Sequence, residues 1–210
     1  MNWFLDMCIL IFYSSEDKSL FSVKTIEFIS KHQNDKFLVC YYISEENLPK
    51  WIKRQQIIIK EVIKKIIDSS YKIGDSEEGS FLYPKDKQKA EKLFIQSSLI
   101  DNKGLFINKI QMSQKEQELR IMQFIEQKTK KVIPISEIDP DLKSNIAMLL
   151  KNHSDAKTLA SGIQQHNKEH LTMLTNDKKD WTKQNIELAI NENSKLAEKY
   201  PEIPEIKYLF

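Results

Sequence analysis

Two kinds of apolar pattern alternate along this chain. Short apolar runs are typical of strands, and longer segments with apolar residues at three- and four-residue steps are typical of amphipathic helices. The short runs predict strands at residues 2–13, 37–43, 131–135, 170–175 and 205–209. The longer segments predict helices at residues 18–32, 47–67, 85–99, 113–129, 139–151, 155–167 and 182–199. Because strands and helices alternate, the pattern predicts a mainly parallel sheet between helical layers.

Two stretches set the expected domain organisation. The run at 2–13 is apolar on both faces except at Asp6, which is typical of a strand covered on both sides by helices. Residues 68–80 hold two of the four glycines and several serines, which predicts a loop. We therefore expect a single domain, residues 1–210, in which residues 68–129 form a loop plus a helical insertion.

The composition limits the possible functions. Of the 210 residues, 40% are hydrophobic and 30% are charged, with a net charge of +2. The chain can therefore bury a sizeable core, but its charge is too balanced for nucleic-acid binding by bulk charge alone. Arg54 and Arg120 are the only arginines, so phosphate contacts would come mainly from lysine, which favours reading of backbone over bases. Since no glycine-rich phosphate loop occurs, we do not expect an ATPase or a dinucleotide enzyme.

The cysteines and the apolar runs bear on location. Cys8 and Cys40 each lie inside an apolar run, and we interpret them as buried, reduced thiols of a cytoplasmic protein. The first apolar run is broken by Asp6 and has no basic leader, so it does not predict a signal peptide. No run approaches ~18 uninterrupted apolar residues, so we expect no membrane span.

Acidic residues stand at the ends of the predicted elements. Glu45 and Glu46 follow the second strand, Asp177 follows a later strand, Asp155 begins a helix, and Asp6 lies in the first apolar run. Ligands of open parallel sheets bind beyond the carboxyl ends of the strands, so these acids can line one edge. Converging carboxylates repel one another, and Mg²⁺ or Mn²⁺ relieves that repulsion. The arrangement therefore predicts a metal site.

Each acid alone also has a simpler interpretation. Asp155 suits the first turn of a helix for which Ser154 is the expected N-cap, and Asp177 suits an Asn-Asp turn. The two glutamates suit solvated charges at a helix start. Asp6 is harder to explain, because acids are rarely buried unless paired. The joint arrangement is stronger evidence than any single residue.

The histidines give a second, weaker hypothesis. His153, His166 and His170 lie close in sequence, and the last two are four residues apart. A zinc site needs a further ligand and suitable geometry, so we do not predict one here.

Lysines and tryptophans suggest nucleic-acid contacts, each with a competing explanation. The four lysines between residues 85 and 92 can follow phosphates, but a solvated helix face explains them at least as well. Trp3, Trp51 and Trp181 can stack on bases, but their apolar neighbours favour core packing.

Several of these stretches resemble the PIN-domain nuclease family. FLDMCILI resembles its first motif, an Asp that ends a buried first strand, and LTMLTNDKKDW resembles its closing Thr-Asn-Asp motif. KVIPISEIDPDLKSNIAMLLKNHSDAKTLASGIQQH is similar to the family's strand, helix and Asp-initiated helix. The resemblance covers roughly residues 1–67 and 130–210. It implies a three-layer α/β/α sandwich and Mg²⁺- or Mn²⁺-dependent cleavage of RNA phosphodiesters, leaving a 5′-phosphate and a 3′-hydroxyl.

The resemblance also implies roles for individual residues. Asp6, Asp155 and Asp177 would be catalytic, metal-binding carboxylates, and Thr175 would orient the site or its water through its hydroxyl. The family usually has small polar residues after the first Asp, where this chain has Met7–Cys8.

One more acid of the family usually lies early in the helix after the second strand. Glu46 is our choice for this metal ligand, and Glu45 is the alternative. Glu61 lies about four turns further along the helix and is too distant. Asp180 is an expected accessory acid.

These observations favour a metal-dependent endoribonuclease, either a toxin of a toxin–antitoxin pair or an RNA-processing enzyme. The expected partners are single-stranded RNA, an antitoxin or other protein, and a second copy of the chain, with no membrane. One alternative is a catalytically inactive PIN-like module that binds RNA or protein. Another is an α/β scaffold whose inserted helices dock a further subunit.

Overall fold

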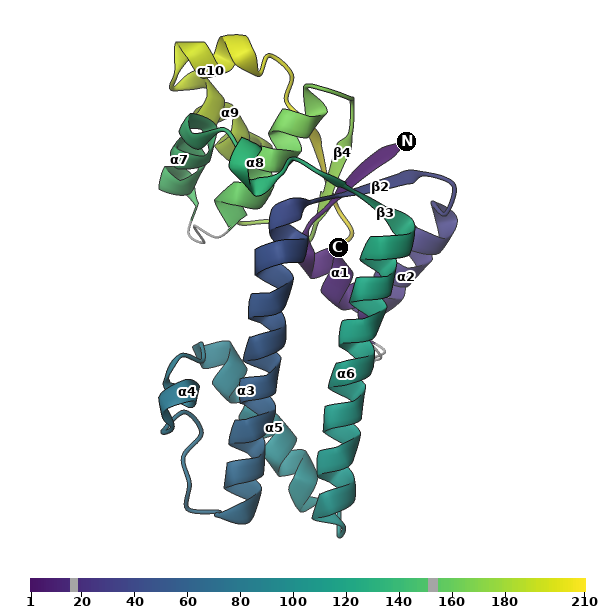
Figure 1. Ribbon diagram of the computed structural model, residues 1–210, viewed down its shortest axis with the longest axis vertical. Helices are drawn as coiled ribbons and strands as arrows, with labels where there is room; N and C mark the ends of the chain where they lie inside the picture. The colour runs from purple at the N-terminus through teal and green to yellow at the C-terminus, as the bar shows by residue number, and fades with distance from the viewer. Residues whose placement is uncertain (16–18, 151–154) are drawn as a thin grey trace. The chain divides into compact units, whose positions relative to one another are not determined.

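The computed structural model divides the chain into two compact units. It describes residues 1–15, 19–150 and 155–210 (Figure 1). Unit 1 contains Met1–Leu48 and Arg120–Phe210, and unit 2 contains Pro49–Leu119.

The unit boundaries fall inside two long helices. These are α3 (Leu48–Ile67) and α6 (Lys103–Lys128). Unit 2 therefore begins and ends earlier along the chain than the insertion expected at residues 68–129.

A five-stranded sheet forms the centre of unit 1. Its strands lie in the order β3 (Thr129–Val132), β2 (Lys36–Cys40), β1 (Asn2–Leu5), β4 (Thr172–Thr175) and β5 (Glu205–Tyr208). Every neighbouring pair is parallel, which confirms the predicted parallel sheet. Parallel strands bring all their carboxyl ends to one edge, and β1 and β4 lie side by side there.

Helices cover both faces of this sheet. Successive residues of a strand point to opposite faces, and Trp3 and Phe4 of β1 are both buried. Trp3 packs edge-on against Phe28 of α2 (Leu20–Lys31), with ring centroids 4.9 Å apart. Phe4 lies against α8 (Asp155–His166), where a Cβ on Gly162 would come within 3.2 Å of its ring. The predicted α/β/α sandwich is confirmed.

Further helical elements complete the described part of unit 1. They are α1 (Met7–Ser14), a π-helical turn (Ile43–Asn47), a 3₁₀ turn (Ile135–Glu137), α7 (Pro140–Leu149), α9 (Lys183–Asn191) and α10 (Ser194–Lys199). The single helix predicted at 182–199 is wrong, because α10 begins anew with its own cap. The side chain of Asn193 accepts a hydrogen bond from the backbone N–H of Lys195 at 3.0 Å.

The first predicted strand, 2–13, is wrong beyond Leu5. β1 ends there, and α1 begins at Met7. Asp6 holds the N-cap position with an extended backbone, so it marks the change from strand to helix. A run that is apolar on every side carries no period that distinguishes a strand from a buried helix.

Unit 2 is helical. It contains most of α3, then α4 (Glu77–Ser80), α5 (Pro84–Ser98) and the first part of α6. Its apolar core contains Ile57, Ile58, Val62, Ile73, Leu82, Ala90 and Phe106.

Three expectations about buried groups can be compared with the fold. Trp3, Trp51 and Trp181 are at most 6% exposed, which confirms core packing. Cys40 is buried and Cys8 half-buried, and both are free thiols. Within the ranges that the structure describes, none of the helices combines the length and the apolar character that a membrane crossing requires.

Candidate functional site

The candidate site begins where β1 and β4 end. These neighbouring strands pair Leu5 with Leu174, and the backbone N–H of Asp6 continues the ladder by donating to the Leu174 carbonyl at 3.1 Å. Asp6 therefore lies beside Thr175, the last residue of β4. The Thr175 hydroxyl donates a hydrogen bond to Asp6 Oδ2 at 2.7 Å.

The turn after β4 brings two more acids to this edge. The backbone N–H of Asp177 donates to Thr175 Oγ1 at 3.0 Å, so the hydroxyl links both acids. Asp177 Oδ1 then accepts hydrogen bonds from the N–H groups of Lys179 and Asp180, at 2.9 and 3.0 Å. This turn places Asp180, which is 5% exposed, next to Asp177.

Asp155 joins the group from the start of α8. One carboxylate oxygen from each of Asp155, Asp177 and Asp180 lies within 4.8 Å of the others. The three acids are half-buried or buried. Residues from two segments that are distant in sequence thus form one acidic cluster, which we call the Asp155 cluster.

Asp6, which we expected as a metal ligand, is buried beside Thr175 but is not one of the three acids of this cluster, and its electrostatic environment is unfavourable for a charge. Burial raises the pKa of Asp6 above its usual value, and the nearby charge of Asp177 raises it further. Hydrogen bonds from Cys8, Thr175 and the backbone of Met7 oppose these effects without cancelling them. A cation at this edge would relieve the cost of ionising Asp6.

Cys8 takes the place of the small polar residue expected after Asp6. Its thiol donates a hydrogen bond to Asp6 Oδ2 at 3.0 Å, and it accepts one from the backbone N–H of Asn176 at 3.4 Å. Burial and the Asp6 charge raise the pKa of the Cys8 thiol well above its usual value, so it stays protonated. Cys8 therefore acts as a neutral donor to Asp6.

The two candidate glutamates lie in the π-helical turn after β2. Glu45 is exposed, and Glu46 is half-buried. Both Glu46 oxygens lie 3.2 Å from the Lys157 ammonium, which also lies over the Tyr42 ring at 4.5 Å. Glu46 is thus paired with a lysine and stands outside the Asp155 cluster.

Two sequence-based expectations lie outside the described residues. These concern Ser154 as an N-cap and His153 as a member of a histidine group.

The donor set of the Asp155 cluster is made only of carboxylate oxygens. Oxygen ligands suit hard cations such as Mg²⁺ or Mn²⁺. Spacings below 5 Å among three carboxylates, with a fourth buried behind them, fit such a cation. Asp155, Asp177 and Asp180 would hold it, and Asp6 and Thr175 would support them from the sheet.

Sequence reasoning missed three residues that shape this edge. Cys8 donates to Asp6, Lys157 neutralises Glu46, and Tyr208 lies close enough to Asp177 for that charge to contribute to its raised pKa, after burial. Lys157 had a readable signal, because it stands two residues after Asp155 on the same helix. Cys8 had the same kind of signal, because it stands two residues after Asp6, whereas Tyr208 has none, since only the pairing of β4 with β5 brings it to the site.

Comparisons with protein-family models, with curated proteins and with solved structures give no match for this chain.

Proposed function

We propose that this protein is a Mg²⁺- or Mn²⁺-dependent ribonuclease with a PIN-like active site. One observation carries the proposal: the carboxylates of Asp155, Asp177 and Asp180 converge within 4.8 Å at the carboxyl edge of a parallel sheet. Ligand sites of open parallel sheets lie at this edge. Two of the stretches that resemble PIN-domain nucleases contain these same acids.

The site residues would have different roles, either cation binding or positioning. The Asp155 cluster would bind the cation, which supplies Lewis-acid chemistry for hydrolysis of a phosphodiester by water. Asp6 stays close behind as a further carboxylate, and the Thr175 hydroxyl fixes the relative positions of Asp6 and Asp177. Asp6 and Asp180 are buried, so their electrostatic interactions are screened less by water than those of the half-buried Asp155 and Asp177.

The proposed substrate is single-stranded RNA, contacted mainly through its phosphates by lysine. A toxin of a toxin–antitoxin pair or an RNA-processing enzyme would both use this chemistry, with an antitoxin or a second copy of the chain as partner. The free thiols Cys8 and Cys40 suit a reducing compartment such as the cytoplasm.

Two observations favour a second candidate, a catalytically inactive module that binds RNA or protein. Glu46, our choice for the fourth ligand, forms an ion pair with Lys157 and does not join the acidic cluster. In addition, Asp177 Oδ1 accepts two backbone hydrogen bonds, as in a purely structural turn.

Labelled single-stranded RNA, incubated with the purified full chain and Mn²⁺, tests the proposal. We expect cleavage that a chelator abolishes and that Asp177→Asn or Asp155→Asn lowers by at least about 100-fold, because each change removes a cation ligand. Asp141→Asn, an exposed acid in the first turn of α7, is the matched control and should leave the rate unchanged. RNA retention without cleavage would support the inactive module instead, and cleavage that survives both the chelator and Asp177→Asn would refute the metal site.

A further inference from the structure

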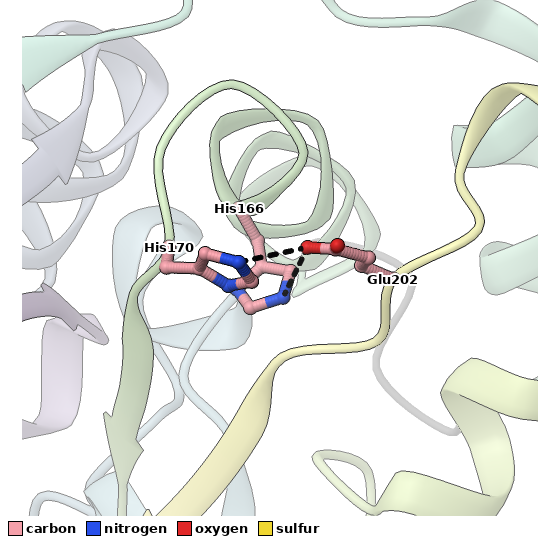
Figure 2. A group of neighbouring side chains, drawn as sticks. All are labelled: His166, His170 and Glu202. Carbon is pink, nitrogen blue, oxygen red and sulfur yellow. Dashed lines mark ion pairs between the residues drawn. The ribbon is translucent and has the colours of Figure 1, made fainter.

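A second group of metal-ligating side chains lies at the opposite edge of the sheet, where β4 and β5 begin. His166 is the last residue of α8, His170 lies two residues before β4, and Glu202 lies three residues before β5. Figure 2 shows the two imidazole rings and the carboxylate turned toward one another. One ligand atom from each of the three lies within 4.8 Å of the others.

Two of the three spacings between these atoms are close to those around a tetrahedral metal, and the third is at most 4.8 Å. Glu202 Oε2 lies 3.2 Å from His170 Nε2 and 3.9 Å from His166 Nε2. A zinc ion about 2.0–2.2 Å from each ligand would hold those atoms roughly 3.4 Å apart. Small side-chain adjustments would therefore bring all three atoms to bonding distance.

Backbone contacts orient the ring of His166. Its Nδ1 lies 3.0 Å from the Leu171 carbonyl and 3.3 Å from the Leu171 N–H. The two contacts belong to different tautomers: with the proton on Nε2, Nδ1 accepts from the Leu171 N–H, and with the proton on Nδ1, Nδ1 donates to the Leu171 carbonyl and the Nε2 lone pair faces Glu202. A metal at Nε2 requires the second tautomer. This is the usual support of a metal-binding histidine, whose second nitrogen donates to a carbonyl or carboxylate.

Asn167 holds Glu202 next to the end of α8. Its side-chain amide donates to the Glu202 carbonyl at 2.9 Å, and its oxygen accepts from the Glu202 N–H at 3.2 Å. The same amide donates to the Ile163 carbonyl at 3.0 Å within α8. Glu202 is thus tied through its backbone to the residue directly after His166.

A simple ion pair explains only part of this arrangement. It accounts for His170, whose Nε2 is within hydrogen-bond distance of Glu202, but not for His166, whose Nε2 at 3.9 Å is too far. His166 is also 7% exposed, so its ring is enclosed by the protein and held in place by the Leu171 backbone. Its place beside Glu202 is therefore not explained by an ion pair.

The three ligands face a pocket of about 520 Å³, whose other walls include Leu171, Thr172, Ile203 and Glu205. We propose that His166, His170 and Glu202 form a Zn²⁺ site whose fourth coordination position opens on this pocket. Two imidazoles and one carboxylate are a zinc ligand set, whereas Mg²⁺ prefers oxygen alone. Three protein ligands with an open position would let a water or a small anionic ligand complete the site.

Calorimetric titration of the metal-free full chain with Zn²⁺, in excess Mg²⁺ to saturate the acidic edge, tests this site. We expect one Zn²⁺ per chain and a Kd that His170→Ala or Glu202→Gln weakens at least tenfold. Both side chains are more than half exposed, so these variants should fold. Asp177→Asn should leave the zinc affinity unchanged, which makes the result independent of the proposed nuclease activity.

Glu205→Gln is the matched control, because Glu205 lines the same pocket but is not one of the three ligands. Absence of zinc binding, an unchanged Kd in both ligand variants, or an equal loss in Glu205→Gln would overturn the proposal. Imidazole ¹⁵N shifts give a second measurement on the unaltered chain. Zinc should move the Nε2 signals of His166 and His170 but not that of His32, and a static His166 signal would refute the ligand set.

Discussion

Asp6 in unit 1 and Glu61 in unit 2 are both buried acids, and their surroundings differ. Four donors reach the Glu61 carboxylate: the Ser76 hydroxyl at 2.6 Å, the Tyr71 hydroxyl and the Gly74 N–H at 2.7 Å, and the Lys64 ammonium at 3.1 Å. Burial raises the pKa of Glu61, but these hydrogen bonds outweigh it and lower the pKa to about 2. Asp6 has fewer donors and an acidic neighbour, and its pKa is raised.

Asp139 shows that the opposite pKa shifts of Asp6 and Glu61 do not follow from their lying in different units. This acid of unit 1 is 7% exposed and accepts hydrogen bonds from the Asp141 and Leu142 N–H groups, from Lys199 and from the Tyr200 hydroxyl. Burial raises its pKa, but these donors outweigh it and lower the pKa to about 2. Burial alone therefore does not distinguish these acids; the number of donors and the presence of acidic neighbours decide the direction of the pKa shift.

The largest effect that tests this contrast is expected at Glu61. Glu61→Gln removes a charge that four donors stabilise and leaves the Lys64 ammonium without its carboxylate. We expect unit 2 to lose about 3 kcal/mol of stability, the range for breaking a buried charged network. Hydrogen exchange of the segment 68–80, which Glu61 holds through Tyr71, Gly74 and Ser76, measures this loss.

Glu78→Gln is the control for that substitution. Glu78 pairs with Lys60 in the same unit, but both side chains are about half exposed, so the change should cost less than about 1 kcal/mol. Equal protection from exchange in Glu61→Gln and in the wild type would show that Glu61 does not hold the loop.

The second effect is a dependence on acid pH. Because the folded pKa of Glu61 is lowered from 4.5 to about 2, its contribution is complete above pH 4.5 and is lost as the pH falls toward 2. Unit 2 should therefore lose about 2 kcal/mol between pH 4.5 and pH 3, at ~1.4 kcal/mol per pH unit. Hydrogen exchange across this range should show the slope in the wild type, and a slope of the same size in Glu61→Gln would contradict this assignment.

The fold was largely readable from the sequence, and the misses have physical causes. The order of strands and helices predicted the parallel sheet, because β2 and β4 are short apolar runs between amphipathic segments. The prediction of one strand over residues 2–13 was wrong beyond Leu5, because residues 7–14 are apolar on every side and show neither a period of 2 nor one of 3.6. The end of α9 was not predicted, because Asn193, the N-cap of α10, is one polar residue among many in this segment.

The site was readable only in part. Asp155 and Asp177 stand at element ends, and the structure brings them together with Asp180, which we expected only as an accessory acid. Asp6 and Glu46, the other two expected ligands, are not members of this cluster. Glu46 forms an ion pair with Lys157, which lies 111 residues away in sequence, and this pair holds Glu46 outside the acidic cluster. Such pairings depend on how strands and helices meet, which no local pattern records.

The smallest effect, and the most direct test of the contrast, is expected at Asp6. Because its folded pKa is raised above 3.8, ionising Asp6 costs the native state free energy at every pH above that value. Without divalent cations at pH 7, Asp6→Asn should therefore stabilise unit 1, by roughly 0.5–2 kcal/mol, because the change removes the cost of ionising a buried acid. Asp139→Asn in the same unit should destabilise it, since that acid has four donors, and urea unfolding followed by hydrogen exchange compares the two. A loss of stability in Asp6→Asn as large as in Asp139→Asn would place Asp6 among the structural acids and remove it from the proposed site.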